Sequence, residues 1–245
     1  MTPDTVVEAT GVVMRFGGVT AVDGASMKLR RNELRCLIGP NGAGKSTFFK
    51  CLSGQLAPTE GEIVLNGEPT AGRMVHEIAR HGVGVKTQVP SLMNGLSVHE
   101  NLWLAARSIP SRTRSEVLAR VDALIDQLGL GPHVWSAAGS LAHGQRQIVE
   151  LGVVLAPDPW LVLLDEPAGG LTRDEVERMA ELVTELTARA TVVVVEHDMN
   201  FVRAIAQTVT AFHRGRILAE GTAGEVLADE RVRDVYLGKH HGEHK

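Results

Sequence analysis

Cysteine is scarce in this chain: Cys36 and Cys51 are the only two in 245 residues. We expect both to be buried, reduced packing residues and not a disulfide. Long hydrophobic runs are missing too, because no apolar stretch approaches the roughly 20 residues that span a bilayer. The first residues also lack the basic and apolar regions of a signal peptide. These absences favour a protein that stays in the cytosol.

The chain has no surplus of positive charge. Its formal net charge is -4 at pH 7, and a surface that binds a nucleic-acid backbone is usually basic. This balance argues against a general nucleic-acid binder. Internal repeats, low-complexity segments and long linkers are absent as well. With 44% hydrophobic residues, the sequence can build one large domain or two small ones around a buried core.

The most informative segment that is present is the glycine-rich run at residues 39–47. Its pattern, G-x-x-x-x-G-K-[ST], predicts a loop that holds a nucleoside triphosphate, because glycines let successive backbone N–H groups point at phosphate oxygens. Lys45 is expected to reach the β- and γ-phosphates, and Ser46 to supply a hydroxyl ligand to Mg²⁺. The candidate nucleotide-binding residues of this loop are Gly39, Pro40, Asn41, Gly42, Ala43, Gly44, Lys45, Ser46 and Thr47.

The flanking segments stand in the order that such a loop requires. Residues 33–38 have the pattern of a short apolar strand, and Phe48, Phe49 and Leu52 recur at helical spacing until Gly54. The helix that begins at the loop would place its positive dipole end against the phosphates.

The rest of the chain alternates between strands and helices, apart from one helical region. The apolar runs 160–164 and 191–195 are typical of strands buried on both faces of a parallel sheet. Thr172 is expected to cap a helix between them. Short strands are expected in the N-terminal part. Turns are expected at residues 60–61, 66–67 and 214–215.

The helical region extends from about residue 89 to residue 155. Capping boxes predict helices that begin after Ser97 and after Thr113. The second of these helices should end at Gly129. Its expected apolar stripe consists of Val117, Leu118, Val121, Leu124, Ile125 and Leu128.

Three polar residues follow expected strand ends, and a fourth, Gln88, lies where the core passes into the helical region. Asp165 and Glu166 lie where open α/β sheets place their ligands. We expect Asp165 to approach Mg²⁺, directly or through water, and Glu166 to orient and help deprotonate the water that attacks the γ-phosphate. His197 can project into the same crevice, and Gln88 can touch the metal and the water at the entry to the helical region. Taken alone, a histidine at position 197 would more often be structural, and a glutamine at position 88 would more often be an ordinary polar loop residue.

A second anion site is expected at residues 141–145, here called the signature segment. Its residues precede an apolar helix, so their backbone donors would lie at a helix N-terminus. Because the segment belongs to the helical region, it cannot easily reach its own phosphate loop. A two-fold dimer would bring it to the partner's nucleotide. The signature segment consists of Leu141, Ala142, His143, Gly144 and Gln145.

Together these motifs resemble the ATP-binding subunit of ABC transporters over nearly the whole chain, in the order phosphate loop, Gln88, signature segment, acidic pair and His197. The resemblance implies an α/β fold: a P-loop NTPase (RecA-like) core with an antiparallel β subdomain and an inserted α-helical subdomain. The core and β subdomain would comprise residues 1–88 and 156–245, and the helical subdomain residues 89–155. It also implies that Phe16 stacks on adenine, although a core strand aromatic is the alternative.

Within that family, four segments look like ATPases of urea and branched-chain amino acid importers: 141–147, 165–171, 195–203 and 218–221. The ending at 234–238 leans toward the urea type. This implies an enzyme that hydrolyses Mg-ATP and pairs with a second ATP-binding subunit, the same chain or a similar one. It would act at the inner face of the plasma membrane with membrane permease subunits and, indirectly, a solute-binding protein. The transported solute and the choice between homodimer and heterodimer stay open.

Two departures from the family pattern affect this expectation. Ala142 replaces the usual serine, which removes a hydroxyl that would meet the partner's γ-phosphate, and His143 is the candidate to compensate. The loop after the acidic pair ends in Thr172 instead of aspartate. A nucleotide-gated regulatory module that hydrolyses weakly is therefore one alternative, and Glu166 and His197 count against it. A soluble ABC ATPase acting on nucleic acid or ribosomes is another, which fits poorly with one cassette and no basic excess.

Two segments are candidates for the permease contact. Residues 89–93 combine a proline with adaptable apolar side chains next to Gln88. Trp135 precedes the signature segment. Core packing is the alternative for both.

Overall fold

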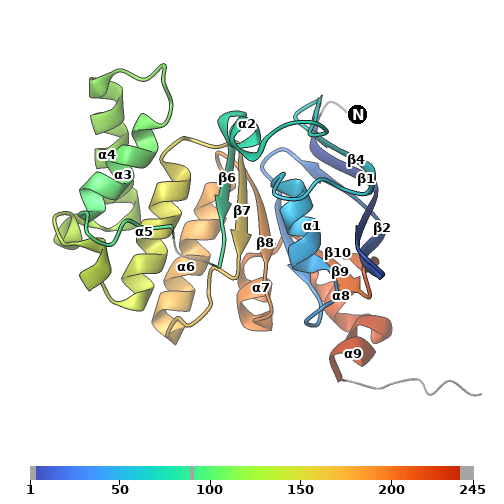
Figure 1. Cartoon of the computed structure of the whole chain (residues 1–245). Coiled ribbons are helices and arrows are strands. Elements are labelled where there is room, and N and C mark those ends of the chain that lie inside the picture. Colours follow the sequence, from blue (N-terminus) through green and yellow to red (C-terminus); the bar gives the residue numbers. More distant parts are fainter. Residues whose placement is uncertain (1–3, 89–90, 238–245) are drawn as a thin grey trace, which may run out of the picture.

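The computed structural model describes residues 4–88 and 91–237. Figure 1 shows two sheets, with a group of helices beside the edge of the larger one. Within the described residues, no helix is both long and apolar enough to cross a membrane. The expected α/β class is confirmed by the sheet and helix content.

The smaller sheet has four antiparallel strands in the order β2-β1-β4-β5. Its strands are β1 (Thr5–Phe16), β2 (Val19–Arg30), β4 (Glu60–Leu65) and β5 (Glu68–Pro69). The expectation of short strands is wrong for β1 and β2, which have 12 residues each. Alternation in these strands is interrupted by register shifts, and such irregularities obscure the period of two on which a strand prediction depends.

Two of the predicted turns fall in this sheet, and one of them is confirmed. Residues 66–67 form the turn between β4 and β5, with positive φ at both positions, so that prediction is confirmed. The turn at residues 60–61 is wrong, because Gly61 lies inside β4. A Cβ at Gly61 would stand 2.3 Å from the carbonyl oxygen of Gly11, so this glycine serves the close approach of β1 and β4.

The larger sheet has six strands in the order β10-β9-β3-β8-β7-β6. Its strands are β3 (Leu34–Ile38), β6 (Val83–Lys86), β7 (Leu161–Asp165), β8 (Thr191–Val195), β9 (Thr208–His213) and β10 (Arg216–Gly221). All run parallel except β10, which returns through the predicted turn at residues 214–215. Every residue of β3, β7 and β8 is buried, which confirms the interpretation of the apolar runs.

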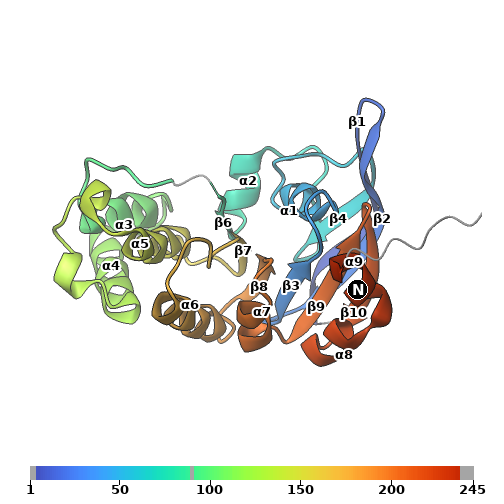
Figure 2. The same cartoon turned by 90° about the horizontal axis from the view of Figure 1, so that it is seen from below.

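Helices cover both faces of the parallel strands, as Figure 2 shows. On one face lie α1 (Lys45–Leu52), which packs between the two sheets, and α2 (Val75–Arg80). On the other lie α6 (Arg173–Leu186) and α7 (Met199–Ile205), with α8 (Ala223–Ala228) and α9 (Glu230–Leu237) following β10. Thr172 is the N-cap residue of α6, as predicted.

The parallel sheet therefore separates two hydrophobic cores. Cys36 lies in one and Cys51 in the other, and both are buried free thiols. Burial raises the pKa of the Cys51 thiol to about 11. Both cysteines are thus packing residues, as expected.

Three helices form the group at the β6 edge: α3 (Val98–Arg107), α4 (Arg114–Leu128) and α5 (His143–Leu155). Short 3-10 turns at Gly131–His133 and Ala138–Ser140 lie between α4 and α5. The predicted capping boxes at Ser97 and Thr113 are present, and α4 ends at Gly129 in the left-handed conformation. Leu118 is exposed, so the predicted stripe is wrong at that position.

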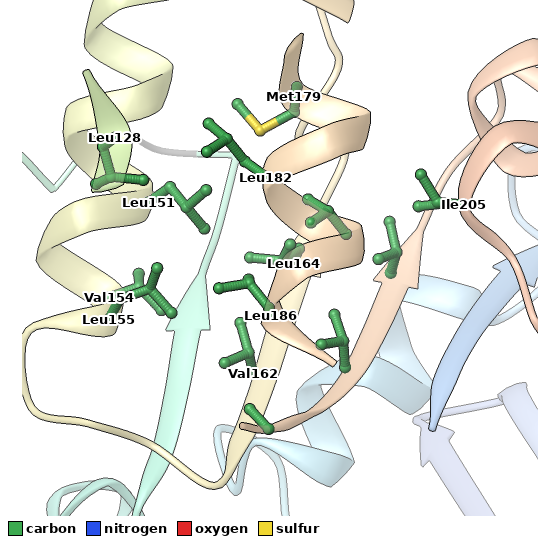
Figure 3. Packing of buried hydrophobic residues seen from close by; sticks show 14 of the residues in the cluster. Leu128, Leu151, Val154, Leu155, Val162, Leu164, Met179, Leu182, Leu186 and Ile205 are labelled. Carbon is green, nitrogen blue, oxygen red and sulfur yellow. The ribbon is translucent and has the colours of Figure 1, made fainter. Parts of the chain in front are cut away.

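The larger core joins this helical group to the sheet. Figure 3 shows Leu151 and Val154 of α5 facing the side of α6 that bears Leu182 and Leu186, with Leu164 of β7 in the same cluster. Burial of such side chains contributes about 1.5 to 3 kcal/mol each. Helix α5 is thus packed between the other helices and the sheet.

Candidate functional site

The phosphate loop encloses the largest concentration of predicted site residues. It connects β3 to α1 and lines a cavity of about 400 Å³. The lining consists of Ala21, Asn41, Gly42, Ala43, Gly44, Lys45, Ser46, Thr47, Gln88 and Glu166. The structure therefore brings Gln88 and Glu166 to the loop, although 78 positions separate them.

Close backbone packing explains the first and last glycines of the loop. A Cβ at Gly39 would lie 2.3 Å from the carbonyl oxygen of Phe212, and one at Gly44 would lie 2.5 Å from that of Ala21. Both residues also have positive φ angles, 145° and 103°. Larger residues are therefore excluded at both positions by space and by backbone conformation.

Lys45 is buried and contributes to the lining of this cavity. Its Nζ donates to the carbonyl oxygens of Gly39 at 2.6 Å and Pro40 at 3.0 Å. Burial lowers the pKa of Lys45, and the charges of Glu166 and Asp165 oppose that shift. The ammonium is thus held at the loop by neutral carbonyls, which a phosphate oxygen can replace as a charged acceptor.

Asp165 has the environment of a metal-site carboxylate. It is buried at the end of β7, and burial, together with the charge of Glu166, raises its pKa. Its Oδ1 has no hydrogen-bond partner among the residues that the structure describes. An unpaired buried carboxylate oxygen is costly unless it meets a cation or a water. This atom therefore fits Mg²⁺ or a water bound to it.

The described residues contain no cluster of three or more His, Cys, Asp or Glu side chains that would hold a metal by itself. Mg²⁺ commonly takes one or two protein oxygens and completes its shell with phosphate and water. The structure is compatible with that mode. Ser46 and Gln88 line the cavity, and Asp165 directly precedes Glu166, which also lines it.

Glu166 and His197 lie next to each other, as strand-end reasoning predicts. His197 Nδ1 is 3.6 Å from Glu166 Oε1. Glu166 has a φ of 49° and its N–H donates to the Val195 carbonyl at 2.9 Å. A left-handed backbone at a glutamate is uncommon and marks a position where the surroundings impose the conformation. The carboxylate is thereby aimed at the cavity.

Glu196 is a site residue that the sequence analysis missed. Its carboxylate is 1% exposed and accepts N–H donation from Ala168 at 3.1 Å, His197 at 2.9 Å and Asp198 at 3.3 Å. It therefore ties the loop that follows Glu166 to the segment that carries His197. A charged residue directly after an entirely apolar strand was the signal that could have revealed it.

The signature segment lies away from this cavity. Among the described residues, none of positions 141–145 contributes to its lining. Ala142 is the N-cap residue of α5, and its N–H donates to Gln145 Oε1 at 3.1 Å. His143 Nε2 is 3.0 Å from the Gly169 carbonyl oxygen. A carbonyl oxygen can only accept a hydrogen bond, so Nε2 must carry a proton to donate in this contact. The segment thus contacts the loop after Glu166 in its own chain.

Gly144 fixes how closely α5 approaches α6. A Cβ there would lie 2.0 Å from Glu175 Oε1. Glu175 Oε2 in turn accepts from the N–H and hydroxyl of Thr172, both at 2.9 Å. Thr172 therefore caps α6 in place of the aspartate usual in the related family.

The remaining predicted residues that the structure describes do not line the nucleotide cavity. Phe16 ends β1, is half exposed and, within the described part of the chain, does not contribute to the cavity lining. Leu92 is buried and Met93 exposed, while Val89 and Pro90 lie outside the described residues. Trp135 is exposed and stacks on His99, with ring centroids 4.8 Å apart.

Comparisons with known proteins agree on one family. A family described as ABC transporter matches residues 22–169. A second, described as branched-chain amino acid ATP-binding cassette transporter, matches residues 216–242.

Three curated relatives illustrate the range of similarity. The chain is 36% identical to the high-affinity branched-chain amino acid transport ATP-binding protein LivG of Salmonella typhimurium, over 94% of this chain and 96% of that protein. It is 34% identical to the corresponding BraF of Pseudomonas aeruginosa, over 96% and 98%. It is 30% identical to the lipopolysaccharide export system ATP-binding protein LptB of Haemophilus influenzae, over 96% and 98%.

Solved structures show the same architecture. The ADP conformation of MJ1267, an ATP-binding cassette of an ABC transporter, has a TM-score of 0.85 and 26% identity, covering 96% of this chain and 99% of that one. The structure of cbiO1 from Clostridium perfringens, part of the ABC transporter complex cbiONQ, has a TM-score of 0.84 and 26% identity, covering 96% and 95%. These structures confirm the predicted P-loop NTPase fold.

Proposed function

The chain belongs to the ABC transporter family of ATP-binding subunits, and from this we propose that it hydrolyses Mg-ATP to drive an importer of the branched-chain amino acid type. The C-terminal match at residues 216–242 and the relatives LivG and BraF support that class of solute. The urea type stays a prediction.

The proposed chemistry depends on the convergence of Glu166 and Gln88 on the phosphate loop, which is the observation that carries the proposal. The loop amides and Lys45 would bind the phosphates, and Ser46, Gln88 and Asp165 would hold Mg²⁺, which when bound would supply positive charge to the γ-phosphate. Glu166 orients the attacking water and accepts its proton. His197 stabilises the transferred group from its position beside Glu166. Phe16 contacts the adenine.

We assign the signature segment to the nucleotide of a second subunit. It lies off its own cavity and at the N-terminus of α5, where backbone donors and the helix dipole favour an anion. A two-fold arrangement with the same chain or a similar one would place it on the partner's γ-phosphate. Since Ala142 has no hydroxyl, the backbone donors carry that contact.

A groove of about 600 Å³ between β6 and the helical group is the proposed docking site for the permease. Its lining combines apolar and polar residues from α2, the end of α3 and the end of α5, including Val85, Ser91, Ala105, Ile109 and Val153. Two of its lining residues, Val85 and Ser91, stand on either side of Gln88 in the sequence. A partner bound in the groove could therefore influence the nucleotide cavity. Such docking would place the protein at the inner face of the plasma membrane, with a solute-binding protein as an indirect partner.

The first test is purification of the tagged chain from detergent-solubilised membranes of its own cells, followed by mass spectrometry and phosphate-release assays. We expect a polytopic permease and ATP turnover that falls at least about 100-fold in Glu166→Gln while ATP binding is kept. Ribosomal or DNA-associated proteins without a permease would contradict the transporter function. Nucleotide binding without turnover, with the permease present, would favour the regulatory alternative that Ala142 suggests.

A further inference from the structure

A buried ion pair connects the sheet to the helix that carries the signature segment. Lys86 is the last residue of β6 and Glu150 lies in α5, with Nζ and Oε2 3.3 Å apart. Each side chain is only 4% exposed. A buried charge without its partner is strongly unfavourable, so these two residues keep each other in one fixed register.

Lys86 stands at the edge of the nucleotide site. It precedes Gln88 by two residues and pairs in the sheet with Leu164, the neighbour of Asp165. Burial and the charge of Glu166 raise the pKa of Asp165, and Lys86 is one of the cations, after Lys50, whose charge opposes that shift. The ammonium therefore interacts with a carboxylate of the site and with a carboxylate of α5.

Glu150 lies seven residues beyond His143, about 10 Å along the helix axis. The other end of α5 is held by the helical group: Arg112 donates to the carbonyl oxygens of Ala156 at 2.6 Å and Pro157 at 3.1 Å, and Arg120 donates to that of Leu155 at 2.6 Å. Helix α5 is thus bound to α4 and its neighbours at one end and bears the signature segment at the other.

Apolar packing contributes to the position of α5 along the sheet. Val154 packs against Gly84, where a Cβ would lie 2.9 Å from the valine methyl, and Figure 3 shows leucines and valines around Val154. The hydrophobic effect behind such contacts is non-directional, whereas an ion pair joins two particular atoms. A shift of one residue moves a helical side chain by about 1.5 Å along the axis and turns it by about 100°, which would separate the two charges.

We propose that the Lys86–Glu150 pair is a positioning pair for ATP hydrolysis, which sets the signature segment relative to the sheet edge that bears Gln88 and Asp165. The inference rests on the proposed function. It assigns to neither residue a contact with nucleotide. Loss of the pair should therefore impair turnover by the assembled transporter more than nucleotide binding by the single chain.

The experiment compares Lys86→Met, Glu150→Gln and the exchanged double variant Lys86→Glu with Glu150→Lys, each in the full chain copurified with its permease. Glu177→Gln is the matched control, because it removes the carboxylate of an exposed ion pair on α6. We measure ATP affinity, kcat, KM and the thermal unfolding midpoint. The single variants should lose about 10-fold or more in kcat with ATP affinity within about 3-fold. The exchanged variant should recover much of kcat.

Unchanged kcat in both single variants would overturn the inference, as would an exchanged variant that regains stability but not turnover. If the single variants do not fold, Lys86→Met with Glu150→Leu removes both charges and keeps the volume. A folded, slow enzyme then supports the positioning role, and one with wild-type kcat refutes it. A wild-type complex without turnover overturns the proposed function itself, whereas normal turnover in wild type and all variants refutes only the positioning pair.

Discussion

Replacing Glu196 by glutamine should destabilise the fold and slow hydrolysis together. The carboxylate accepts three backbone N–H groups, one on Oε1 and two on Oε2. A glutamine can keep the two bonds on one oxygen, but its NH₂ group then faces the N–H of Ala168. A lost hydrogen bond to a charged group costs about 1.5 to 3 kcal/mol, and the buried N–H left without an acceptor adds about 1 kcal/mol or more.

The expected destabilisation is therefore about 2.5 to 4 kcal/mol in Glu196→Gln. For a chain of this size, each kcal/mol lowers the unfolding midpoint by about 2 to 4 °C, so the midpoint should fall by about 5 to 16 °C. The loop after Glu166 would lose its attachment to the His197 segment. We expect kcat to fall by about 10-fold or more, since small displacements of catalytic groups have effects of this size.

Calorimetry and phosphate release measured on the same preparation test this reasoning. Glu185→Gln, an exposed position on α6, is the control and should change stability by less than about 0.5 kcal/mol. A Glu196→Gln variant as stable as that control would show that the buried carboxylate does not hold the two segments together. A destabilised variant with normal kcat would refute only the effect on the catalytic pair.

Three further results are expected. Burial and Glu166 raise the pKa of Asp165 in the folded protein. Ionised Asp165 therefore lowers the free energy of unfolding at pH values above this raised pKa. The destabilisation disappears below the pKa of about 3.9 that the residue has in the unfolded chain. Asp165→Asn should therefore match or exceed the wild-type unfolding midpoint at pH 7 without ligands, yet lose the extra stability conferred by Mg-ATP in a thermal-shift assay; a large loss of stability without ligands would contradict this. Gly144→Ala places a Cβ against Glu175, so Glu175 must move away from Thr172 and α6 should lose about 0.5 to 2 kcal/mol of capping, measurable by urea unfolding, with an unchanged midpoint as the opposing result. Glu166→Gln should keep ATP affinity in a filter-binding assay while single-turnover hydrolysis falls at least about 100-fold, and near-normal hydrolysis would exclude Glu166 as the base.

Local motifs were read well from the sequence because each depends on a few neighbouring residues. The phosphate loop, the capping boxes at Ser97 and Thr113 and the buried runs that became β7 and β8 all follow from backbone geometry or from periodicity within one segment. The errors have local causes too. Register shifts obscured the length of β1 and β2. The sequence predicts a turn at Gly61, but the glycine is needed because β1 and β4 approach closely there, and the sequence does not distinguish the two cases.

The placement of Glu166 beside His197 was also predictable, since parallel strands that end at one edge of a sheet bring their following residues together. The supporting role of Glu196 was not, because it requires the two adjoining loops to present their N–H groups to one buried carboxylate.

By itself, the amino-acid sequence determined the chemistry that this protein carries: a phosphate loop, an acidic pair and a signature segment, each encoded in consecutive residues. The tertiary structure alone decided which of these elements face one another. The strand order β3-β8-β7-β6 brings Gln88 and Glu166 to one cavity, leaves residues 141–145 outside it and joins Lys86 to Glu150. The physical reason is that such distances depend on how whole elements pack, and the burial that drives packing is non-directional and spread over many side chains.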